Sequence, residues 1–314
     1  MKSFVTGGAG FIGSHLVDRL MEEGFVTVYD NLSLGKKEFI KHHLSKKKFR
    51  FVKADLFNLS YLTKCMKSHD VVFHMAANSD IELGTAKTDV DLKQGVIATY
   101  NVLEAMRDNN IKKLIFASTS AVYGEPDVFP TPENYGAKLP ISLYGASKLA
   151  GEGLISAFCH LYDMQAWIFR FANVIGERST HGVMYDFVNK LIKNQKHLEI
   201  LGDGNQTKPY IYVKDCVDGI IYGAKYSKQD VNVFNLGCDD NTDVNKIAKI
   251  IIKEMKLKNV KITYRGGKRG WKGDVAYVNY DTAKMKKLGW KPSLSSDEAI
   301  KKAVKEYLKQ LKIR

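Results

Sequence analysis

The feature that most constrains this chain is a glycine-rich turn close to its first residue. The segment TGGAGFIG, residues 6–13, lies between an apolar run at 2–6 and a stretch at about 11–23 whose apolar residues recur at helical spacing. Glycines there allow a tight turn, a close approach of a pyrophosphate to the backbone, and close packing of the helix on the strand. The N–H groups at the start of the helix favour phosphate. The pattern predicts a dinucleotide-binding turn; a glycine-rich turn without a ligand is the alternative.

An acidic residue follows at the end of the next expected strand. Asp30 comes directly after the run 25–29 and seventeen residues after Gly13. A carboxylate there can accept hydrogen bonds from both ribose hydroxyls and would repel a 2′-phosphate, which favours NAD over NADP. Capping of a turn is the alternative role for this residue. Asp55, after the third expected strand, is a candidate for the adenine edge, but its position alone does not decide.

The rest of the chain continues this alternation of strands and helices. Further strands are expected at 49–53, 71–74, 113–118 and 165–171, with helices at about 96–107 and 143–161. This order predicts an α/β fold, a doubly wound parallel sheet of the Rossmann type, over residues 1–172. The rhythm then becomes irregular, and we expect a smaller α/β C-terminal substrate domain over 173–314, with chain near 206–233 returning to the first domain. Its expected helices are 184–194, 214–226, 244–255 and 296–311, and its expected strands are 211–213, 233–236 and 260–264.

The composition argues against several other classes. Of the 314 residues, 45% are apolar and 26% charged, so a mostly disordered chain is not expected. No apolar run approaches about 18 residues, which argues against a membrane span, and no export signal is recognisable. The four cysteines form no metal or disulfide pattern, so we expect reduced thiols in the cytoplasm. The net charge of +14 accompanies no nucleic-acid motif and is expected to reflect a lysine-rich surface, with no nucleic acid or membrane as a partner.

The strongest chemical signal is a tyrosine and a lysine four residues apart. Tyr144 and Lys148 would share one face of the helix at 143–161. The lysine charge, like a positive nicotinamide ring, would lower the pKa of the phenol and make it a usable general base. An exposed helical pair is the alternative, but the pair follows the fifth strand of the expected dinucleotide fold. That strand ends in Ser118, Thr119 and Ser120, whose hydroxyls can contact a reacting oxygen or satisfy the turn.

These segments together resemble the extended short-chain dehydrogenase/reductases of the NAD-dependent nucleotide-sugar epimerase/dehydratase family. The resemblance runs from residue 2 to about residue 292. The matching segments are TGGAGFIGSH (6–15), YDNLSLG (29–35), ADL (54–56), HMAA (74–77), NVLEA (101–105), STSAVYGE (118–125), YGASK (144–148), RFANVIG (170–176), GDGNQ (202–206), YIYVKD (210–215) and LGWKP (288–292). They are specific for the family and much less so for one reaction.

The resemblance implies a set of site residues. The catalytic residues would be Thr119, Tyr144 and Lys148. NAD would be held by Gly7, Gly10, Phe11, Ile12, Gly13, Asp30, Asn31, Asp55, Leu56, Ala76 and Ala77, together with Tyr144 and Lys148. The nucleotide-sugar substrate would meet Thr119, Tyr144, Asn173, Leu201, Lys208, Tyr210, Arg269, Asp274 and Val278. Among these, Asn173 matches the asparagine on the substrate diphosphate, and Leu201 and Tyr210 match positions near the base.

Departures from the family pattern narrow the reaction. Dehydratases of the family carry an Asp-Glu pair after the threonine, and decarboxylases carry a Glu, but here the positions are Ser120 and Ala121. Epimerases need neither acid. The implied activity is therefore NAD-dependent inversion at C4 of UDP-glucose, UDP-galactose or their N-acetyl forms, through a transient 4-keto sugar. A 4-keto sugar reductase, another epimerase or a decarboxylase of the family, and a non-catalytic NAD sensor remain alternatives.

Other departures concern the substrate site. Two diphosphate-binding arginines of the family are Lys208 and Trp271 here, with Arg269 as a substitute for the second. The asparagine of the family's NxxGT segment is Gly95. Val278 stands where a bulky tyrosine restricts some epimerases, so we expect room for an N-acetyl group. The resemblance also implies a homodimer through the helices near 96–107 and 145–161.

One histidine, His74, ends the predicted strand at 71–74. His74 has no second histidine or cysteine at metal-binding spacing. We therefore expect a packing or capping role for it, and no metal site in the chain.

Overall fold

The computed structural model describes residues 1–136, 138–271 and 273–313, and the chain packs as two compact units. The first unit comprises Met1–Tyr123, Ser142–Arg170 and Ile220–Phe234, and the second comprises Gly124–Ile141, Phe171–Gly219 and Asn235–Arg314. Residues 124–141 thus pack with the second unit, whereas the sequence analysis placed them in the first domain. The segment that returns to the first unit is 220–234, within the expected region apart from its last residue.

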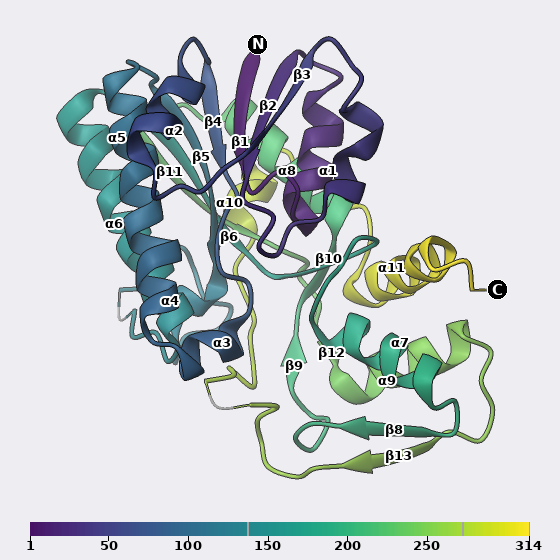
Figure 1. Cartoon of the computed structure of the whole chain (residues 1–314). Coiled ribbons are helices and arrows are strands. Elements are labelled where there is room, and N and C mark those ends of the chain that lie inside the picture. The colour runs from purple at the N-terminus through teal and green to yellow at the C-terminus, as the bar shows by residue number, and fades with distance from the viewer. Residues whose placement is uncertain (137, 272, 314) are drawn as a thin grey trace. The chain divides into compact units, whose positions relative to one another are not determined.

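A seven-stranded sheet forms the centre of the first unit (Figure 1), in the order β11-β6-β5-β4-β1-β2-β3. Its strands are β1 (Lys2–Thr6), β2 (Phe25–Asp30), β3 (Phe49–Lys53), β4 (Val71–His74), β5 (Lys113–Thr119), β6 (Gln165–Phe171) and β11 (Val231–Leu236). β1 pairs in parallel with β2 and β4, β2 with β3, and β4 with β5. The order reverses beside β1, which is where α/β sheets bind dinucleotides. The predicted fold class is confirmed.

Helices cover both faces of this sheet. In Figure 1, α2, α5 and α6 lie on one side of the strands and α1 on the other. The helical segments of this unit are α1 (Phe11–Leu20), η1 (Lys37–His43), α2 (Leu59–Met66), α3 (Ile81–Ala86), α4 (Asp89–Asp91), η2 (Leu92–Ile97), α5 (Ala98–Asp108), η3 (Ser120–Tyr123), α6 (Leu143–Tyr162) and the second half of α8 (Val213–Tyr226). η2 is a π-helical turn that leads into α5. Phe4, Phe116 and Met106 are fully buried between the sheet and α5, where they form part of the core.

Several helical segments of this unit were not expected from the sequence, and α2 is the longest α-helix among them. α2 begins after Asn58, whose side chain accepts the N–H of Tyr61 at 3.1 Å as an N-cap. Leu62, Cys65 and Met66 are buried on its inner face. The sequence contains the capping residue and the apolar residues at three- and four-residue spacing. However, a helix of this length is too short for that periodicity to predict it.

The second unit carries shorter elements. Its strands are β7 (Asn173–Ile175), β8 (His197–Ile200), β9 (Thr207–Lys208), β10 (Tyr210–Tyr212), β12 (Thr242–Asp243) and β13 (Lys261–Tyr264). They form three two-stranded sheets, β10 with β7, β12 with β9, and β13 with β8. Its helices are α7 (Val183–Lys193), α9 (Val244–Glu254), α10 (Ala283–Lys287), α11 (Ser296–Gln310) and the first half of α8. The expected helices there agree with α7, α8, α9 and α11 to within one residue at each end.

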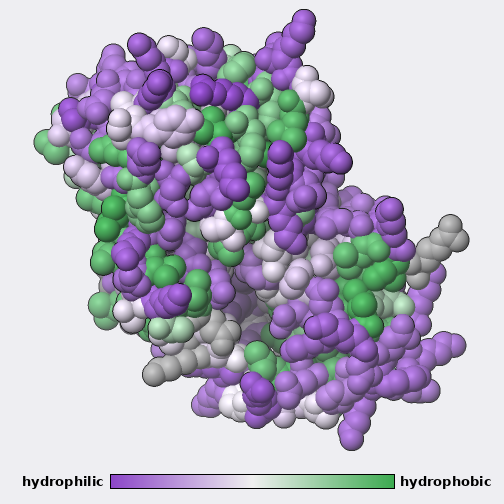
Figure 2. All heavy atoms as spheres, in the orientation of Figure 1, coloured by the Kyte–Doolittle hydropathy of each residue, from purple (hydrophilic) through white to green (hydrophobic). Residues whose placement is uncertain are grey.

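The surface reflects the lysine-rich composition. Hydrophilic side chains predominate on the face drawn in Figure 2, and hydrophobic patches interrupt them over the region of α5 and α6. Within the described ranges, every helix is too short or too polar to cross a bilayer.

Candidate active site

In the first unit, the glycine-rich turn brings backbone segments closer together than side chains would permit. Gly7 has φ +67°, and a Cβ built there would lie 2.7 Å from the backbone of Ala76, just after β4. A Cβ on Gly13 would lie 2.1 Å from the carbonyl oxygen of Gly7. Gly10, the residue before α1, contributes no side-chain cap. The first turn of α1, which holds the predicted residues Phe11, Ile12 and Gly13, therefore offers backbone N–H groups that fit the pyrophosphate of NAD.

Asp30 ends β2, as the sequence predicted, and is only 7% exposed. One carboxylate oxygen accepts the N–H of Ala9 at 2.9 Å, and the other accepts the N–H of Leu32 at 2.8 Å. Burial raises the pKa of Asp30 above its ordinary value, and these two backbone hydrogen bonds lower it. The carboxylate is thus held beside the glycine-rich turn, where the predicted contact with the ribose requires it.

The next predicted cofactor residues contact one another at the ends of β2 and β3. The Asn31 amide donates to the Asp55 carboxylate at 2.9 Å, and the Tyr29 hydroxyl donates to the Asp55 backbone carbonyl at 2.9 Å. Leu56 is buried beside them, and its carbonyl accepts a hydrogen bond from Asn101 on α5 at 2.9 Å. These contacts fix one wall of the site at the carboxyl edge of the sheet.

His74 lies in a directed chain of hydrogen bonds at the end of β4. The Thr99 hydroxyl donates to the Gly95 carbonyl at 2.5 Å, so its oxygen accepts the Nε2–H of His74 at 3.1 Å. On the other side, the Thr6 hydroxyl donates to Nδ1 at 2.7 Å and accepts the Ala76 N–H at 3.3 Å. The chain requires the neutral Nε2–H tautomer, and burial lowers the pKa of His74 to about 3. His74 thereby fixes the backbone that precedes Ala77 and carries Ala76, and it has the packing role that the sequence favoured over metal binding.

The three predicted catalytic residues lie together at the end of β5 and the start of α6. Ser142 caps α6 by accepting a first-turn N–H at 3.1 Å, which places Tyr144 and Lys148 one turn apart on the same helix. The Thr119 hydroxyl lies close enough to the Tyr144 phenol to lower its pKa. The Lys148 ammonium is almost fully buried and donates to the carbonyl of Ala117 at 2.7 Å. A hydroxyl at the end of β5 and a phenol and a cation one turn apart on α6 thus lie in one part of the first unit.

Burial changes the protonation of this group in two directions. Burial raises the pKa of Tyr144 to about 12. Thr119 opposes this rise, and the charge of Asp91 adds to it. Burial lowers the pKa of Lys148 to about 8, while Glu152 and Asp91 raise it. The sequence analysis expected the lysine charge to lower the pKa of the phenol; for the chain alone this is wrong, because desolvation is the larger effect. A positive nicotinamide ring is the remaining charge that favours the phenolate.

One turn beyond Lys148 on α6 lies a buried ion pair that was not predicted from the sequence. Glu152 follows Lys148 by one helical turn, and Arg170 on β6 donates to its two carboxylate oxygens at 3.0 and 2.6 Å. Ser118 donates to the same carboxylate at 2.5 Å, and Arg170 also donates to the Tyr123 hydroxyl at 2.8 Å. The pair is buried, with 4% and 8% of the two side chains exposed. Two features of the sequence could have indicated this pair. Glu152 is the third polar residue at four-residue spacing on one helix, and Arg170 is an arginine within an apolar strand.

In the second unit, the predicted substrate-binding cations are held by carboxylates. The Lys208 ammonium contacts Asp274 Oδ1 at 2.5 Å. Arg269 donates to the backbone carbonyl of Asp274 at 3.2 Å and pairs with Glu125 at 2.7 Å. The structure thus brings together Lys208, Arg269 and Asp274, which the resemblance placed in one substrate site. Glu125, the partner of Arg269, was not assigned a role from the sequence.

The other predicted substrate residues lie on and around the short strands of this unit. β7 and β10 pair in parallel with Asn173 opposite Tyr210. The Asn173 amide donates to the Pro209 carbonyl at 3.5 Å. Val278 is 9% exposed, and Leu201 is partly exposed directly after β8. Among these four predicted positions, only Asn173 and Tyr210 are shown to be strand partners.

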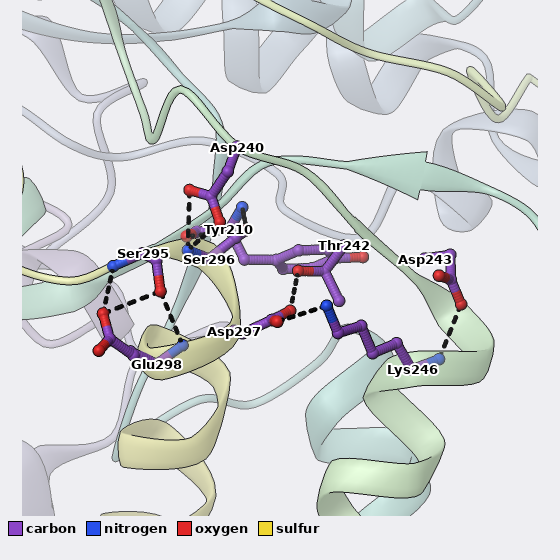
Figure 3. Close-up of polar contacts among 9 residues, drawn as sticks. All are labelled: Tyr210, Asp240, Thr242, Asp243, Lys246, Ser295, Ser296, Asp297 and Glu298. Carbon is purple, nitrogen blue, oxygen red and sulfur yellow. Dashed lines mark hydrogen bonds and ion pairs between the residues drawn. The ribbon is translucent and has the colours of Figure 1, made fainter.

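Tyr210 is fixed by polar contacts at the start of α11, which Figure 3 shows in close-up. Its N–H donates to the Ser296 hydroxyl at 2.6 Å, and the Ser296 N–H donates to both carboxylate oxygens of Asp240 at 3.0 Å. Next to it, Asp297 pairs with Lys246 of α9 at 2.5 Å. Burial raises the pKa of the Tyr210 phenol, and nearby carboxylates raise it further. Tyr210 thus carries a neutral, buried phenol on a strand that these backbone contacts fix.

A cluster of metal-binding residue types lies elsewhere on the first unit. Asp18 of α1 and His42 and His43 of η1 bring three donor atoms within 4.8 Å of one another. Both Nε2 atoms lie 2.7 Å from the same Asp18 oxygen. However, Nδ1 of His43 is buried without a hydrogen-bond partner, whereas a metal-bound histidine almost always donates from its second nitrogen. The arrangement therefore fits hydrogen bonding to a carboxylate better than metal binding.

Comparison with known proteins agrees with this geometry. Residues 3–237 match the NAD dependent epimerase/dehydratase family. The UDP-glucose 4-epimerase of Mycolicibacterium smegmatis is 31% identical over 313 residues, 97% of each chain. A crystal structure of a UDP-galactose 4-epimerase is 40% identical with a TM-score of 0.89, covering 99% of this chain and 100% of that one. The UDP-N-acetylglucosamine 4-epimerase of Methanobrevibacter ruminantium M1, in complex with UDP-N-acetylmuramic acid, is 32% identical with a TM-score of 0.88 over 98% of each. The chain belongs to the NAD-dependent epimerase/dehydratase family and has NAD as its cofactor.

Proposed function

We propose that this enzyme inverts the configuration at C4 of a UDP-linked hexose, with residues 1–172 holding NAD and residues 173–314 holding the nucleotide sugar. The observation that carries the proposal is the composition of the catalytic group. Thr119 lies close enough to the Tyr144 phenol to lower its pKa, Lys148 follows Tyr144 by one turn of α6, and the residues after Thr119 are Ser120 and Ala121 of η3. Elimination of water would need an acid and a base there, whereas C4 inversion needs only one proton carrier.

The proposed reaction uses Tyr144 as the proton carrier. Tyr144 accepts the proton of the C4 hydroxyl while the Thr119 hydroxyl hydrogen-bonds to the same sugar oxygen. The Lys148 charge alone does not overcome the burial that raises the pKa of Tyr144, so the phenolate form would also depend on the positive nicotinamide ring. NAD supplies a reversible hydride acceptor beside C4. The resulting 4-keto sugar turns so that its opposite face receives the hydride, and Tyr144 returns the proton. Protons and electrons balance within one cycle, so no external reductant is required.

The substrate assignment rests on the second unit. Lys208 and Arg269 are cations suited to a diphosphate, although a lysine lacks the two-pronged geometry of an arginine. Tyr210 and Leu201 would lie near the base, and Asn173 near the diphosphate. Val278 is smaller than a tyrosine, which favours acceptance of N-acetylated hexoses. The relatives at 40% and 32% identity, one named for UDP-galactose and the other for UDP-N-acetylglucosamine, support a UDP-hexose in either form.

We also propose a homodimer through α5 and α6. Several large hydrophobic residues of these helices and of the adjoining η2 are exposed: Leu92, Ile97, Tyr100, Leu143, Leu161 and Tyr162. Apolar surface of this kind on a helix pair favours association with a second copy. Light scattering at micromolar concentration measures the mass directly, and a monomer at all concentrations contradicts this part of the proposal.

The function is tested by incubating the protein with four UDP-hexoses and with one UDP-hexuronic acid. The protein is mixed separately with UDP-glucose, UDP-galactose, their N-acetyl forms and UDP-glucuronate, and products are followed by NMR together with absorbance at the NADH band. C4 inversion without net NADH change is expected for at least one UDP-hexose. Turnover only with UDP-glucose and UDP-galactose would exclude acceptance of N-acetyl hexoses. Stoichiometric NADH consumption would identify a 4-keto sugar reductase instead. Release of carbon dioxide would identify a decarboxylase, and NAD binding without turnover would identify a sensor.

A further inference from the structure

A buried carboxylate with an unpartnered oxygen lies on the segment that packs against the catalytic helix. Asp91 ends α4, directly before the π-helical turn η2, and both elements contact α6. It is 1% exposed. Its Oδ1 accepts the Asn78 amide at 3.1 Å, while Oδ2 is buried without a hydrogen-bond partner among the described residues. A buried carboxylate with one neutral partner is costly unless a positive charge lies near.

Two glycines allow this segment its position. A Cβ built on Gly84 would lie 2.0 Å from Oδ2 of Asp91, so no other residue fits there without moving the carboxylate. A Cβ on Gly95 would lie 2.3 Å from the Ser147 hydroxyl of α6. Gly95 is also the position where the family pattern has an asparagine. The close approach of η2 to α6 therefore leaves no room for a side chain at position 95 unless Ser147 moves. Asp91 lies four residues earlier on the same segment.

The charges around the catalytic lysine identify the partner of Asp91. Lys148 is 2% exposed, and the two carboxylates that raise its pKa are Glu152 and Asp91. Glu152 is bonded through both oxygens to the guanidinium of Arg170, which cancels most of its charge. Asp91 is hydrogen-bonded to the neutral amide of Asn78. Burial raises the pKa of Asp91 and lowers that of Lys148, and each group opposes the shift of the other, so each charge stabilises the other.

We propose that Asp91 is the counter-ion of Lys148, a positioning residue that keeps the catalytic ammonium charged at neutral pH. Among the described side chains, the other charged or titratable groups in this environment are Glu152 and His74 beside Lys148, Asp80 beside Asp91, and the Tyr144 phenol. The effect on Lys148 follows from the charge arrangement alone, whereas its consequence for turnover rests on the proposed function. An uncharged residue at 91 leaves Lys148 buried with only the neutralised Glu152 nearby, which favours the amine over the ammonium.

The direct test is a titration of Lys148 itself. The full chain is labelled with 13Cε-lysine, the Lys148 resonance is assigned by its loss in Lys148→Met, and its pKa is measured by NMR. Asp91→Asn removes the charge and keeps the shape, and Asp91→Ala repeats the test without a new amide. We expect the pKa of Lys148 to fall by roughly one unit or more in both variants. Asp89→Asn is the matched control, because Asp89 lies on the same short helix but is exposed and pairs with Lys93 at 2.6 Å.

The outcomes separate this inference from the proposed function. An unchanged pKa of Lys148 in a folded Asp91→Asn or Asp91→Ala protein, judged by its melting curve, overturns the inference whether or not turnover is found. A shifted pKa without turnover of any UDP-sugar supports the counter-ion and removes the epimerase. If turnover is found, the fall of kcat at high pH should move to lower pH by the same amount in the Asp91 variants. A uniform loss of kcat at every pH, with the pKa unchanged, would mean that Asp91 only supports the fold.

Discussion

The two units of the molecule hold their charged side chains in different ways. In the first unit, the Glu152–Arg170 pair is buried, with at most 8% of either side chain exposed. In the second unit, Arg269 and Glu125 are about half exposed, at 42% and 50%, and Lys208 is 19% exposed. The buried pair cannot exchange partners without leaving a charge in the protein interior. The exposed pair can release its arginine to another anion at little cost, since such pairs contribute at most about 1 kcal/mol.

This difference matches the tasks proposed for the two units. Reaction chemistry needs groups whose geometry and charge do not change between substrates, and buried partners provide that. Substrate binding needs cations that can move from a protein carboxylate to a phosphate. We therefore expect substitutions in the first unit to change kcat or stability, and substitutions around Asp274 in the second unit to change KM.

The largest expected effect is the loss of the phenol in the first unit. Tyr144→Phe removes the proposed proton carrier and should lower kcat by roughly 100- to 10,000-fold, while NAD binding and the melting curve stay close to those of the wild type. Tyr226→Phe, on the exposed end of α8, is the control. Steady-state kinetics with the accepted UDP-sugar measure both. Activity within a few-fold of the wild type would assign the proton transfer to another group.

The second effect is on stability. Glu152→Gln leaves the Arg170 guanidinium buried without its anion, and we expect a loss of ~3–5 kcal/mol in the free energy of unfolding. Glu104→Gln breaks the more exposed pair with Arg107 and should cost less than about 1 kcal/mol. Urea unfolding of the three proteins gives the comparison. Equal losses in the two variants would contradict the distinction between buried and exposed pairs.

Much of the first unit could be predicted because its signals are local. The strand and helix alternation, the glycine-rich turn and the four-residue spacing of Tyr144 and Lys148 are all readable within a few residues. Glu152 continues the same spacing and could have been found by extending it one turn. Asp91 could not, because it lies on a three-residue helix before a π-helical turn, where no periodicity applies.

The second unit is less predictable for a physical reason. Its charged partners are brought together by loops that are far apart in the sequence. Lys208 and Asp274 are 66 positions apart, and Arg269 and Glu125 are 144 apart. No local spacing encodes such pairs, so only the resemblance could place Lys208, Arg269 and Asp274 near one substrate. It gave no role to Glu125.

A third prediction concerns the pH dependence of the first unit. The folded protein holds His74 neutral, with a pKa of about 3, whereas the unfolded chain binds a proton below about pH 6.5. Acid therefore favours the unfolded state. The stabilisation that neutral His74 gives the folded protein is complete above about pH 6.5. Below that pH, the free energy of unfolding falls by about 1.4 kcal/mol for each pH unit until the pH approaches 3. His74→Gln can bond to Thr6 and Thr99 without titrating, so its unfolding free energy should fall less steeply from pH 6.5 to 4. Exposed His197→Gln is the control, and equal slopes for His74→Gln and the wild type contradict the buried neutral tautomer.

The fourth prediction tests the binding role of the second unit. Lys208→Met removes a cation proposed for the diphosphate, and we expect KM for the UDP-sugar to rise about tenfold, or about 1.4 kcal/mol, with kcat within a few-fold of the wild type. NAD affinity should not change. Lys246→Met, which removes a cation of similar length from α9, is the matched control. A fall in kcat without a change in KM would move Lys208 from substrate binding to the chemical step.

The smallest expected effect has the opposite sign. Glu125 holds Arg269 in an exposed pair, so a phosphate that binds Arg269 must displace this carboxylate. Glu125→Gln removes the competing charge and should lower KM by up to about fivefold, equivalent to less than about 1 kcal/mol, without changing kcat. Glu306→Gln, which breaks the exposed pair with Lys309 on α11, should leave KM unchanged. A higher KM in Glu125→Gln would mean that Glu125 orients Arg269 for the substrate instead of competing with it, and that the partners in the second unit are as fixed as those in the first.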